Sequence, residues 1–238
     1  MSMSSLPRLL RDLRYRLFYR VLTKRGYSLL ELGNRSTGCS WTFCPDGLSP
    51  RSIVYSGGVG RDISFEHALV QRFGCSVFLF DPSPTGAETM ALPENSISQF
   101  RFFPVGLAGK CTTLRLAPPL NSDEGSWFSS TGEGNSIEVP CLDLGTLMRQ
   151  NRHDHIDLLK LDIEGAEYGV LDDLLQRRLP VRQIAVEFHH SNLPGIPRRQ
   201  SIRMILRLIR AGYGLLNDQG NNHTFLNARL LQRVGSQR

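Results

Sequence analysis

The sequence has no run of about 18 apolar residues and no C-x-x-C pair. The first absence excludes a membrane-spanning helix, and the second argues against a zinc site with the usual cysteine spacing. The N-terminus also lacks the continuous apolar core of a secretory signal peptide, because arginines interrupt it every few residues. The five cysteines are scattered and odd in number, which favours reduced thiols in a cytoplasmic protein.

Positive charge is scarce beyond the N-terminus. The net charge is +6, and the first 25 residues hold seven basic residues against one acidic residue. The body of the chain is therefore near neutral, and we expect no nucleic-acid partner. Residues 1–27 are predicted to contain a basic amphipathic helix, because apolar residues recur at helical spacing between residues 6 and 25.

Three interpretations of this helix stay open. It can pack its apolar side on the domain, with the arginines in solvent. It can instead make peripheral contact with an anionic membrane surface or an acidic partner through residues 6–25. It also resembles a mitochondrial presequence, although Asp12 counts against that interpretation.

The G-x-G-x-x-G pattern of many dinucleotide-binding proteins is missing too. In its place, residues 51–82 predict a strand, a glycine-rich loop, a helix and a second strand that ends in an acid. The residues that mark the loop and the acid are Gly57, Gly58, Gly60 and Asp81. Asp81 lies 24 positions after Gly57, which suits a carboxylate that binds a ribose diol at the end of the next strand.

The rest of the chain divides into a loop-rich lead-in, residues 28–50, and one domain, residues 51–230. The lead-in carries a small predicted strand at Trp41–Phe43. Further short strands are predicted at Phe100–Val105, Thr112–Leu116 and Ile137–Val139. The segment 118–135 is rich in serine, glycine and acids around Trp127, and it is either a surface loop or a cover for a substrate site.

A second informative stretch crowds carboxylates at the end of a predicted core strand, Ile156–Ile163. Asp162, Glu164 and Glu167 fall within six residues, at the edge where open α/β sheets place ligands. Glu167 alone would suit a helix N-terminus. Asp162 follows an apolar run, where a carboxylate without a partner is costly, so we interpret it as functional.

The last predicted parallel strand, Val181–Phe188, brings Glu187 and His189 to the same edge. His190 is predicted to be a solvated loop residue. A helix at Ser201–Ala211 and a hairpin within residues 212–226 follow. A doubly wound sheet that finishes in an antiparallel hairpin is typical of class I S-adenosylmethionine methyltransferases.

Two stretches resemble the FkbM-type S-adenosylmethionine-dependent methyltransferases. They are Leu161–Glu167, with its D-x-E-G-x-E pattern, and the glycine segment Val54–Glu66. The resemblance implies an α/β Rossmann-like class I methyltransferase fold, with a mixed seven-stranded sheet, helices on both faces and a C-terminal antiparallel hairpin. It also implies S-adenosylmethionine as cofactor and O-methylation of a hydroxyl on a small-molecule or sugar-like acceptor.

The resemblance assigns residues to the cofactor. The glycines would pass under its methionine part, Asp81 with Pro82 would meet the ribose, and Val105 and Gly106 would lie near the adenine. Tyr55 and Ser56 stand where many such enzymes carry an acid, and Arg61 is basic where an acid is expected. Asp62 or Asp162 would then hold the amino group of the methionine.

The expected catalytic residues are Asp162, Glu164 and His189. Asp162 or His189 would act as general base, with Glu164 and Glu187 orienting the substrate or holding a divalent cation. No motif demands a metal, so the metal question stays open. Two other functions also stay open: a non-catalytic binding module of the same fold, and an NAD-dependent enzyme built on the same strand–glycine–helix unit.

Overall fold

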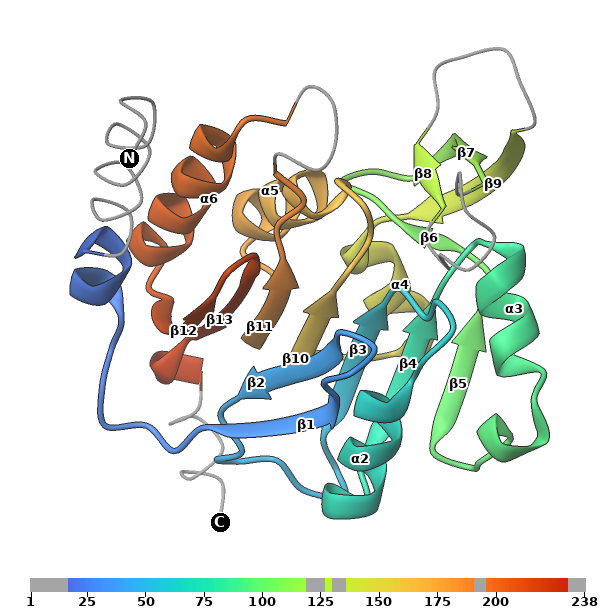
Figure 1. The fold of residues 1–238 in the computed structure, drawn as a ribbon, viewed down its shortest axis with the longest axis horizontal. Helices are drawn as coiled ribbons and strands as arrows, with labels where there is room; N and C mark the ends of the chain where they lie inside the picture. The colour runs from blue at the N-terminus through green and yellow to red at the C-terminus, as the bar shows by residue number, and fades with distance from the viewer. Residues whose placement is uncertain (1–16, 119–126, 130–135, 191–195, 231–238) are drawn as a thin grey trace, which may run out of the picture.

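A seven-stranded mixed sheet organises the protein (Figure 1). The computed structural model describes residues 17–118, 127–129, 136–190 and 196–230. In spatial order, the sheet consists of β12 (Gly214–Gln219), β13 (Asn222–Leu226), β11 (Val181–Glu187), β10 (Ile156–Leu161), β3 (Ile53–Gly57), β4 (Ser76–Phe80) and β5 (Phe100–Phe103). Neighbours from β11 to β5 pair in parallel, whereas β13 is antiparallel to β11 and β12. The predicted Rossmann-like α/β fold with its C-terminal hairpin is confirmed.

Alternate residues of the central strands pack into two separate hydrophobic cores. On β3, Val54 packs into one core and Tyr55 into the other. Successive β4 residues divide in the same way, so that Val77 and Leu79 lie on one side and Phe78 and Phe80 on the other. Successive side chains of a strand point to opposite faces, which is why both faces of this sheet need a covering layer.

Three helices cover one face, and a helix with a hairpin covers the other (Figure 1). The first layer consists of α4 (Leu144–Asn151), α5 (Glu167–Arg177) and α6 (Arg198–Arg210). The second consists of α2 (Ser64–Phe73), β1 (Leu30–Asn34) and β2 (Cys39–Phe43). Two short elements connect β4 to β5, namely α3 (Pro84–Met90) and the 3-10 helix η1 (Pro93–Asn95).

The lead-in of the chain is more ordered than its loop-rich sequence predicts. The strand expected at Trp41–Phe43 is present as β2, and it pairs with β1, for which no strand was predicted. Trp41 and Phe43 are buried and pack on Phe65 of α2. The hairpin therefore serves as the outer layer of the sheet, and its turn reaches the carboxyl ends of the strands.

Most of the predicted N-terminal helix lies outside the described residues. Its last part is helical at residues 17–22, where Tyr19 is buried against His223. Leu17 and Val21 are exposed, so the described turn packs on the domain by one side only. In the part of the chain that the structure describes, no helix is long and apolar enough to cross a membrane.

A second, four-stranded sheet rises beside the carboxyl ends of β3 and β4 (Figure 1). In spatial order, it consists of β6 (Gly106–Leu107), β9 (Ile137–Leu142), β7 (Thr112–Ala117) and β8 (Phe128–Ser129). The sequence predicted β7 and part of β9 as separate strands but not their pairing. This small sheet forms a wall of the cavity described next.

Candidate active site

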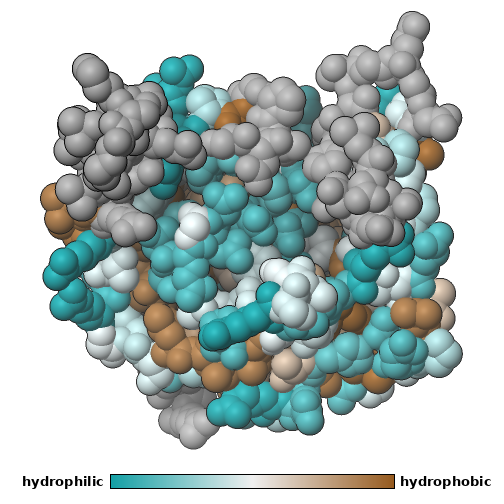
Figure 2. Space-filling view, viewed as in Figure 1, coloured by the Kyte–Doolittle hydropathy of each residue, from teal (hydrophilic) through white to brown (hydrophobic). Residues whose placement is uncertain are grey.

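One cavity of about 1230 Å³ opens at the carboxyl ends of β3, β4, β10 and β11. Figure 2 shows hydrophilic residues gathered in the middle of the viewed face, over these strand ends. The predicted site residues that line it are Gly58, Gly60, Asp62, Asp81, Pro82, Gly106, Asp162, Glu164, Glu187 and His189. Asp81 and Asp162 thus face one cavity although they lie on different strands.

Gly57 and Val105, also predicted to meet the cofactor, are not among the lining residues. A Cβ at Gly57 would lie 2.6 Å from Leu107 Cδ1, so this glycine allows close packing of the small sheet behind the cavity. Val105 packs on the larger core. The lining starts one residue later at both places, with Gly58 and Gly106.

The glycine loop is held by Asp81. Asp81 Oδ2 accepts hydrogen bonds from the backbone N–H groups of Val59, at 2.9 Å, and Gly60, at 3.1 Å. Its Oδ1 accepts from the N–H of Ser83 at 2.8 Å. The carboxylate of Asp81 is therefore buried, and its hydrogen bonds come from the backbone. Only the lone pairs that these bonds leave over could accept from the hydroxyls of a ribose, as predicted.

Gly58 is where the loop touches the neighbouring strand. It adopts φ +86°, a conformation that glycine tolerates best. A Cβ at this position would lie 2.0 Å from the carbonyl oxygen of Asp162. Gly58 therefore allows the glycine loop and the end of β10 to lie in direct contact.

Asp62 connects the glycine loop to the β1–β2 hairpin. Its Oδ1 accepts from the N–H of Ser64, at the start of α2, and its Oδ2 accepts from the hydroxyl of Thr37 at 2.5 Å. Partial burial would raise the pKa of Asp62, but these hydrogen bonds outweigh it and lower the pKa. Asp62 is thus an ionised carboxylate on the cavity wall, as its predicted contact with an ammonium group requires.

A buried acid from α2 lies beneath the glycine loop. Ser56 donates a hydrogen bond of 2.5 Å to Glu66 Oε1, and Lys160 Nζ lies 3.6 Å from the same oxygen. Lys160 also donates to the carbonyl of Gly58 at 2.6 Å. Burial alone would lower the pKa of Lys160, but Glu66 and other nearby acids outweigh it and raise the pKa. Lys160 is therefore favoured in its charged form beneath the loop.

The sequence analysis missed both Glu66 and Lys160. A usable signal exists for Lys160, because it interrupts the apolar run of β10 and a buried lysine needs a partner. No local signal marks Glu66. It stands beside Phe65 on the inner side of α2, and its partners come from β3 and β10.

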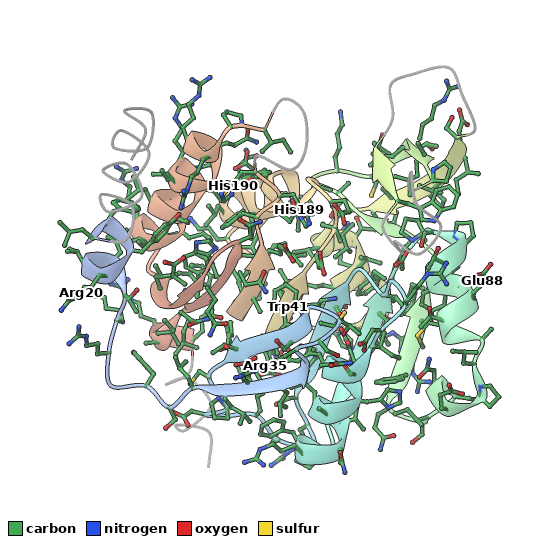
Figure 3. The ribbon with its side chains drawn as sticks, viewed as in Figure 1. Arg20, Arg35, Trp41, Glu88, His189 and His190 are labelled. Carbon is green, nitrogen blue, oxygen red and sulfur yellow. The ribbon has the colours of Figure 1, made fainter. Side chains whose placement is uncertain are left out.

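The ends of β10 and β11 form a second, more charged rim. Asp162 has a side chain that is 33% exposed, Glu164 is 19% exposed, and His189 is 7% exposed. His189 Nε2 lies 3.4 Å from Glu164 Oε2 and 3.7 Å from Asp162 Oδ1. All three predicted catalytic residues therefore lie close together. Figure 3 shows His189 near the ends of these two strands.

His189 is held from behind by Glu167, which is completely buried. The Nδ1 atom of His189 lies 2.6 Å from Glu167 Oε1. The same oxygen accepts hydrogen bonds from the N–H groups of Ile163 and Gly165. Burial alone would lower the pKa of His189, but Glu167, Glu164 and Asp162 outweigh it and raise the pKa to about 9. The three acids therefore favour the protonated form of the ring.

Glu187 completes this rim. Burial, reinforced by the charge of Asp162, raises the pKa of Glu187 to about 7. A carboxylate with such a pKa exchanges its proton near neutral pH. Perturbed acids of this kind, gathered in a cleft, are typical of functional sites.

His190 contradicts its prediction as a solvated residue. It is buried, and its Nδ1 lies 3.0 Å from the hydroxyl of Ser201, which in turn lies 2.8 Å from Tyr168 Oη. Figure 3 places it on the α5 and α6 side of His189. Of these two consecutive histidines, His189 lines the cavity and His190 is buried in the core.

The small sheet contributes Trp127 to the cavity wall. Its Nε1 donates a hydrogen bond of 3.1 Å to the hydroxyl of Thr85 on α3. Most of the loop predicted at residues 118–135 lies outside the described residues, so its two interpretations stay untested. At Trp127 itself, the chain bridges the small sheet and α3 beside the cavity.

Comparison with known proteins agrees with this geometry at the family level. A family model described as the methyltransferase FkbM domain matches residues 51–215. The search among curated proteins found no match.

Solved structures give only weak likenesses. An rRNA methylase from Streptococcus thermophilus is 14% identical, with a TM-score of 0.42 over 75% of this chain and 86% of that chain. The fibrillarin pre-rRNA processing protein of Methanococcus jannaschii is 11% identical, with a TM-score of 0.40 over 85% and 83%. TYW2 of M. jannaschii, solved in complex with AdoMet, is 8% identical, with a TM-score of 0.37 over 86% and 89%. These scores are low, and we base no conclusion on them.

Proposed function

The chain belongs to the FkbM-type S-adenosylmethionine-dependent methyltransferase family, and we propose that it methylates a hydroxyl of a small, sugar-like acceptor. The observation that carries the proposal is the cavity with two unlike rims. One rim is a glycine loop held by Asp81, and the other gathers Asp162, Glu164, Glu187 and His189. We assign the cofactor to the first rim and the acceptor to the second.

The charge of the lining favours a small hydroxyl acceptor over a nucleic acid. Among the described residues that line the cavity, six are acids, against one lysine and one arginine: Asp62, Asp81, Glu94, Asp162, Glu164, Glu187, Lys160 and Arg61. Nucleic-acid binding depends on neutralising phosphates with basic residues. The acids of this lining would instead repel the phosphates. Carboxylates instead accept hydrogen bonds from hydroxyl groups.

Amide side chains extend this hydroxyl-binding surface. Gln219, Asn221 and Asn222, at the β12–β13 turn, line the cavity next to Glu187. Together with the acids they offer donors and acceptors to an acceptor that carries several hydroxyls. A polyhydroxy compound fits this lining better than an apolar one.

The transfer is an in-line displacement. An oxygen lone pair of the acceptor forms the new O–CH3 bond while the S–CH3 bond of the sulfonium breaks and leaves its electron pair on sulfur. The hydroxyl proton must leave as well. Because His189 is buried and its Nδ1 lies against Glu167, we assign the base to Asp162, whose carboxylate is partly exposed at the rim. Alignment of donor and acceptor supplies the rest of the rate.

The test has two stages. Calorimetry of the purified full-length chain with S-adenosylhomocysteine and with NAD is expected to show binding of the first only. Incubation with S-adenosylmethionine and a panel of sugars, phenols and RNA, followed by mass spectrometry, should then show a mass gain of one methyl group in a hydroxyl compound.

The variant D162N is expected to bind S-adenosylhomocysteine normally and to lose turnover by about 10²- to 10⁴-fold. Turnover that survives D162N would refute its role as base. Methylation of RNA in place of the small acceptors would refute the acceptor class. Failure to bind S-adenosylhomocysteine would instead favour a non-catalytic binding module.

A further inference from the structure

We propose that Asp162, Glu164 and His189 form a binding site for a divalent transition-metal cation. One ligand atom from each residue, a carboxylate oxygen or an imidazole nitrogen, lies within 4.8 Å of the other two. The two carboxylates follow β10 and the imidazole follows β11, so a parallel strand pair fixes their spacing. All three side chains line the cavity, which leaves its open side for water or substrate.

The orientation of His189 supports the proposal independently of the acids. The side chain is more than nine-tenths buried, and Glu167 fixes Nδ1 at 2.6 Å. A metal-binding histidine is oriented in the same way, with a carboxylate on one ring nitrogen and the metal on the other. Here the other nitrogen, Nε2, points toward Asp162 and Glu164.

The distances at Nε2 leave room for an ion. The two carboxylate oxygens lie at 3.4 and 3.7 Å, beyond the roughly 2.7–3.2 Å of an N–H···O hydrogen bond. Metal–ligand bonds of about 2.0–2.2 Å place neighbouring ligand atoms about 3 Å apart. The three ligand atoms lie within 4.8 Å of one another, so side-chain movement toward a central ion would bring all three into coordination.

The backbone at Glu164 is strained toward this arrangement. Glu164 adopts φ +51°, a left-handed conformation that residues other than glycine seldom take. Gly165 follows with φ +97°, and together they turn the chain sharply after Asp162. Strain of this kind persists where the surrounding structure imposes it, often at ligand sites. Here it aims Glu164 Oε2 at His189 Nε2.

Among the described residues of this rim, acids also outnumber basic groups. Asp162, Glu164, Glu167 and Glu187 face a single imidazole, and Glu167 Oε2 is buried without a hydrogen-bond partner among the described residues. Lys160 is committed elsewhere, to Gly58 and Glu66. A divalent cation would compensate the excess directly, because a bound ion is often the largest charge in a site.

The donor set indicates the kind of ion. One imidazole nitrogen with two carboxylates suits Mn²⁺ or Zn²⁺, whereas Mg²⁺ and Ca²⁺ prefer oxygen ligands alone. Its catalytic use rests on the proposed function: a cation here would lower the pKa of a coordinated acceptor hydroxyl, so that Asp162 removes the proton more easily. Binding of the ion itself does not depend on that reaction.

The experiment measures metal binding directly. The full-length protein is treated with EDTA, desalted, and titrated with MnCl2, ZnCl2 and MgCl2 by calorimetry, with Mn²⁺ also followed by electron paramagnetic resonance. We expect one Mn²⁺ or Zn²⁺ per chain and much weaker Mg²⁺ binding. H189N and D162N should weaken Mn²⁺ binding at least 100-fold, and E167Q about 10- to 100-fold.

A matched control is present in the chain. His155 also lies between two acids, with Nδ1 at 2.5 Å from Asp154 and Nε2 at 3.3 Å from Asp157, but it is outside the cavity. H155N should bind Mn²⁺ like the wild type. Circular dichroism of each variant excludes unfolding as the cause of any loss.

Two results would overturn the proposal: a wild type that binds neither Mn²⁺ nor Zn²⁺, or an H189N variant that binds as tightly as the wild type. The first would mean that an imidazolium alone balances the acids. Titration of the same samples with S-adenosylhomocysteine separates this failure from that of the methyltransferase assignment. A protein that binds the nucleoside but no metal loses only the cation site.

Discussion

The two rims of the cavity are both acidic, but they satisfy their acids in opposite ways. On the glycine-loop rim, Asp81 accepts three backbone hydrogen bonds and Glu66 is paired with Lys160 and Ser56. On the rim of β10 and β11, Asp162 and Glu164 lie at ion-pair distances from His189, and the charges of Asp162, Glu164 and His189 all act on Glu187. The acids of the first rim are held by backbone N–H groups, a serine and a lysine, whereas those of the second lie close to one another around a histidine.

This difference separates binding from chemistry. Preformed hydrogen bonds hold the glycine loop in one shape, so a cofactor that enters this rim finds it already ordered. Acids that lie close together raise the free energy of the second rim, and a ligand or ion that pairs with them lowers it. Changes at the first rim should therefore reduce stability, whereas changes at the second should alter activity and pH dependence.

The largest expected effect is at Lys160, which supports the glycine-loop rim. K160M leaves Glu66 buried without its positive partner, and breaking a buried ion pair on one side costs about 3–5 kcal/mol. Urea unfolding should show this loss. Adding E66Q to K160M removes the unpaired charge and should recover part of the lost free energy of unfolding. K110M, at an exposed lysine, serves as control with a change below about 0.5 kcal/mol. A K160M variant as stable as K110M would show that the pair does not support the loop.

The next effect compares two glycines of the same loop. G58A places a Cβ at 2.0 Å from the Asp162 carbonyl oxygen and should cost about 2–4 kcal/mol. Gly60 has a similar conformation, φ +55°, but nothing within 4 Å of its Cβ position, so G60A should cost about 1 kcal/mol. Equal losses in urea unfolding would mean that backbone strain, and not contact with β10, makes glycine necessary at residue 58.

A smaller effect contrasts one acid from each rim. D81N turns an acceptor of Asp81 into a donor that faces backbone N–H groups, and an unsatisfied buried donor costs about 1–3 kcal/mol. Asp162 makes no hydrogen bond through its carboxylate to a described residue and is one-third exposed, so D162N should change stability by less than about 0.5 kcal/mol. Thermal or urea unfolding measures both. A larger loss in D162N than in D81N would reverse the assignment of the rims.

Sequence reasoning worked best where a signal is local. The apolar runs of β3, β4, β10 and β11 predicted the parallel core of the sheet, and the carboxylate after the last apolar residue predicted Asp162. The strand ends of a parallel sheet share an edge, so the meeting of Asp81 and Asp162 at one cavity followed from these runs. The hairpin at the C-terminus was marked by its turn residues.

What the sequence did not predict depends on pairing between distant segments. Glu66 belongs to the site only because Ser56 and Lys160 lie above it, and Glu167 orients His189 from 22 residues away. In the small sheet, β6 and β8 have only two residues each, and β7 and β9, which were predicted separately, pair across a long stretch of chain. His190 was assigned to solvent because it follows a strand end, whereas Ser201 of α6 and Tyr168 of α5 bury it. None of these contacts leaves a periodic trace in the chain.

The smallest effect tests the charged rim by its pH dependence. Burial raises the pKa of Glu187 from 4.5 to about 7, so the fold favours the protonated acid. The stability that this preference contributes is full below about pH 4.5 and is lost as the pH rises through 7. Glutamine mimics the protonated acid, so E187Q should match the wild type at pH 4.5 and exceed it by about 1–2 kcal/mol above pH 7.

Urea unfolding in EDTA at several pH values measures the advantage of E187Q, and an advantage that does not vary with pH would contradict the burial of a titrating Glu187. Addition of Mn²⁺ then sharpens the contrast between the rims. A cation held by Asp162, Glu164 and His189 favours ionised Glu187 and should reduce the advantage of E187Q at pH 8. The stability difference between D81N and the wild type should stay the same, because Asp81 is already satisfied by the glycine loop and Ser83.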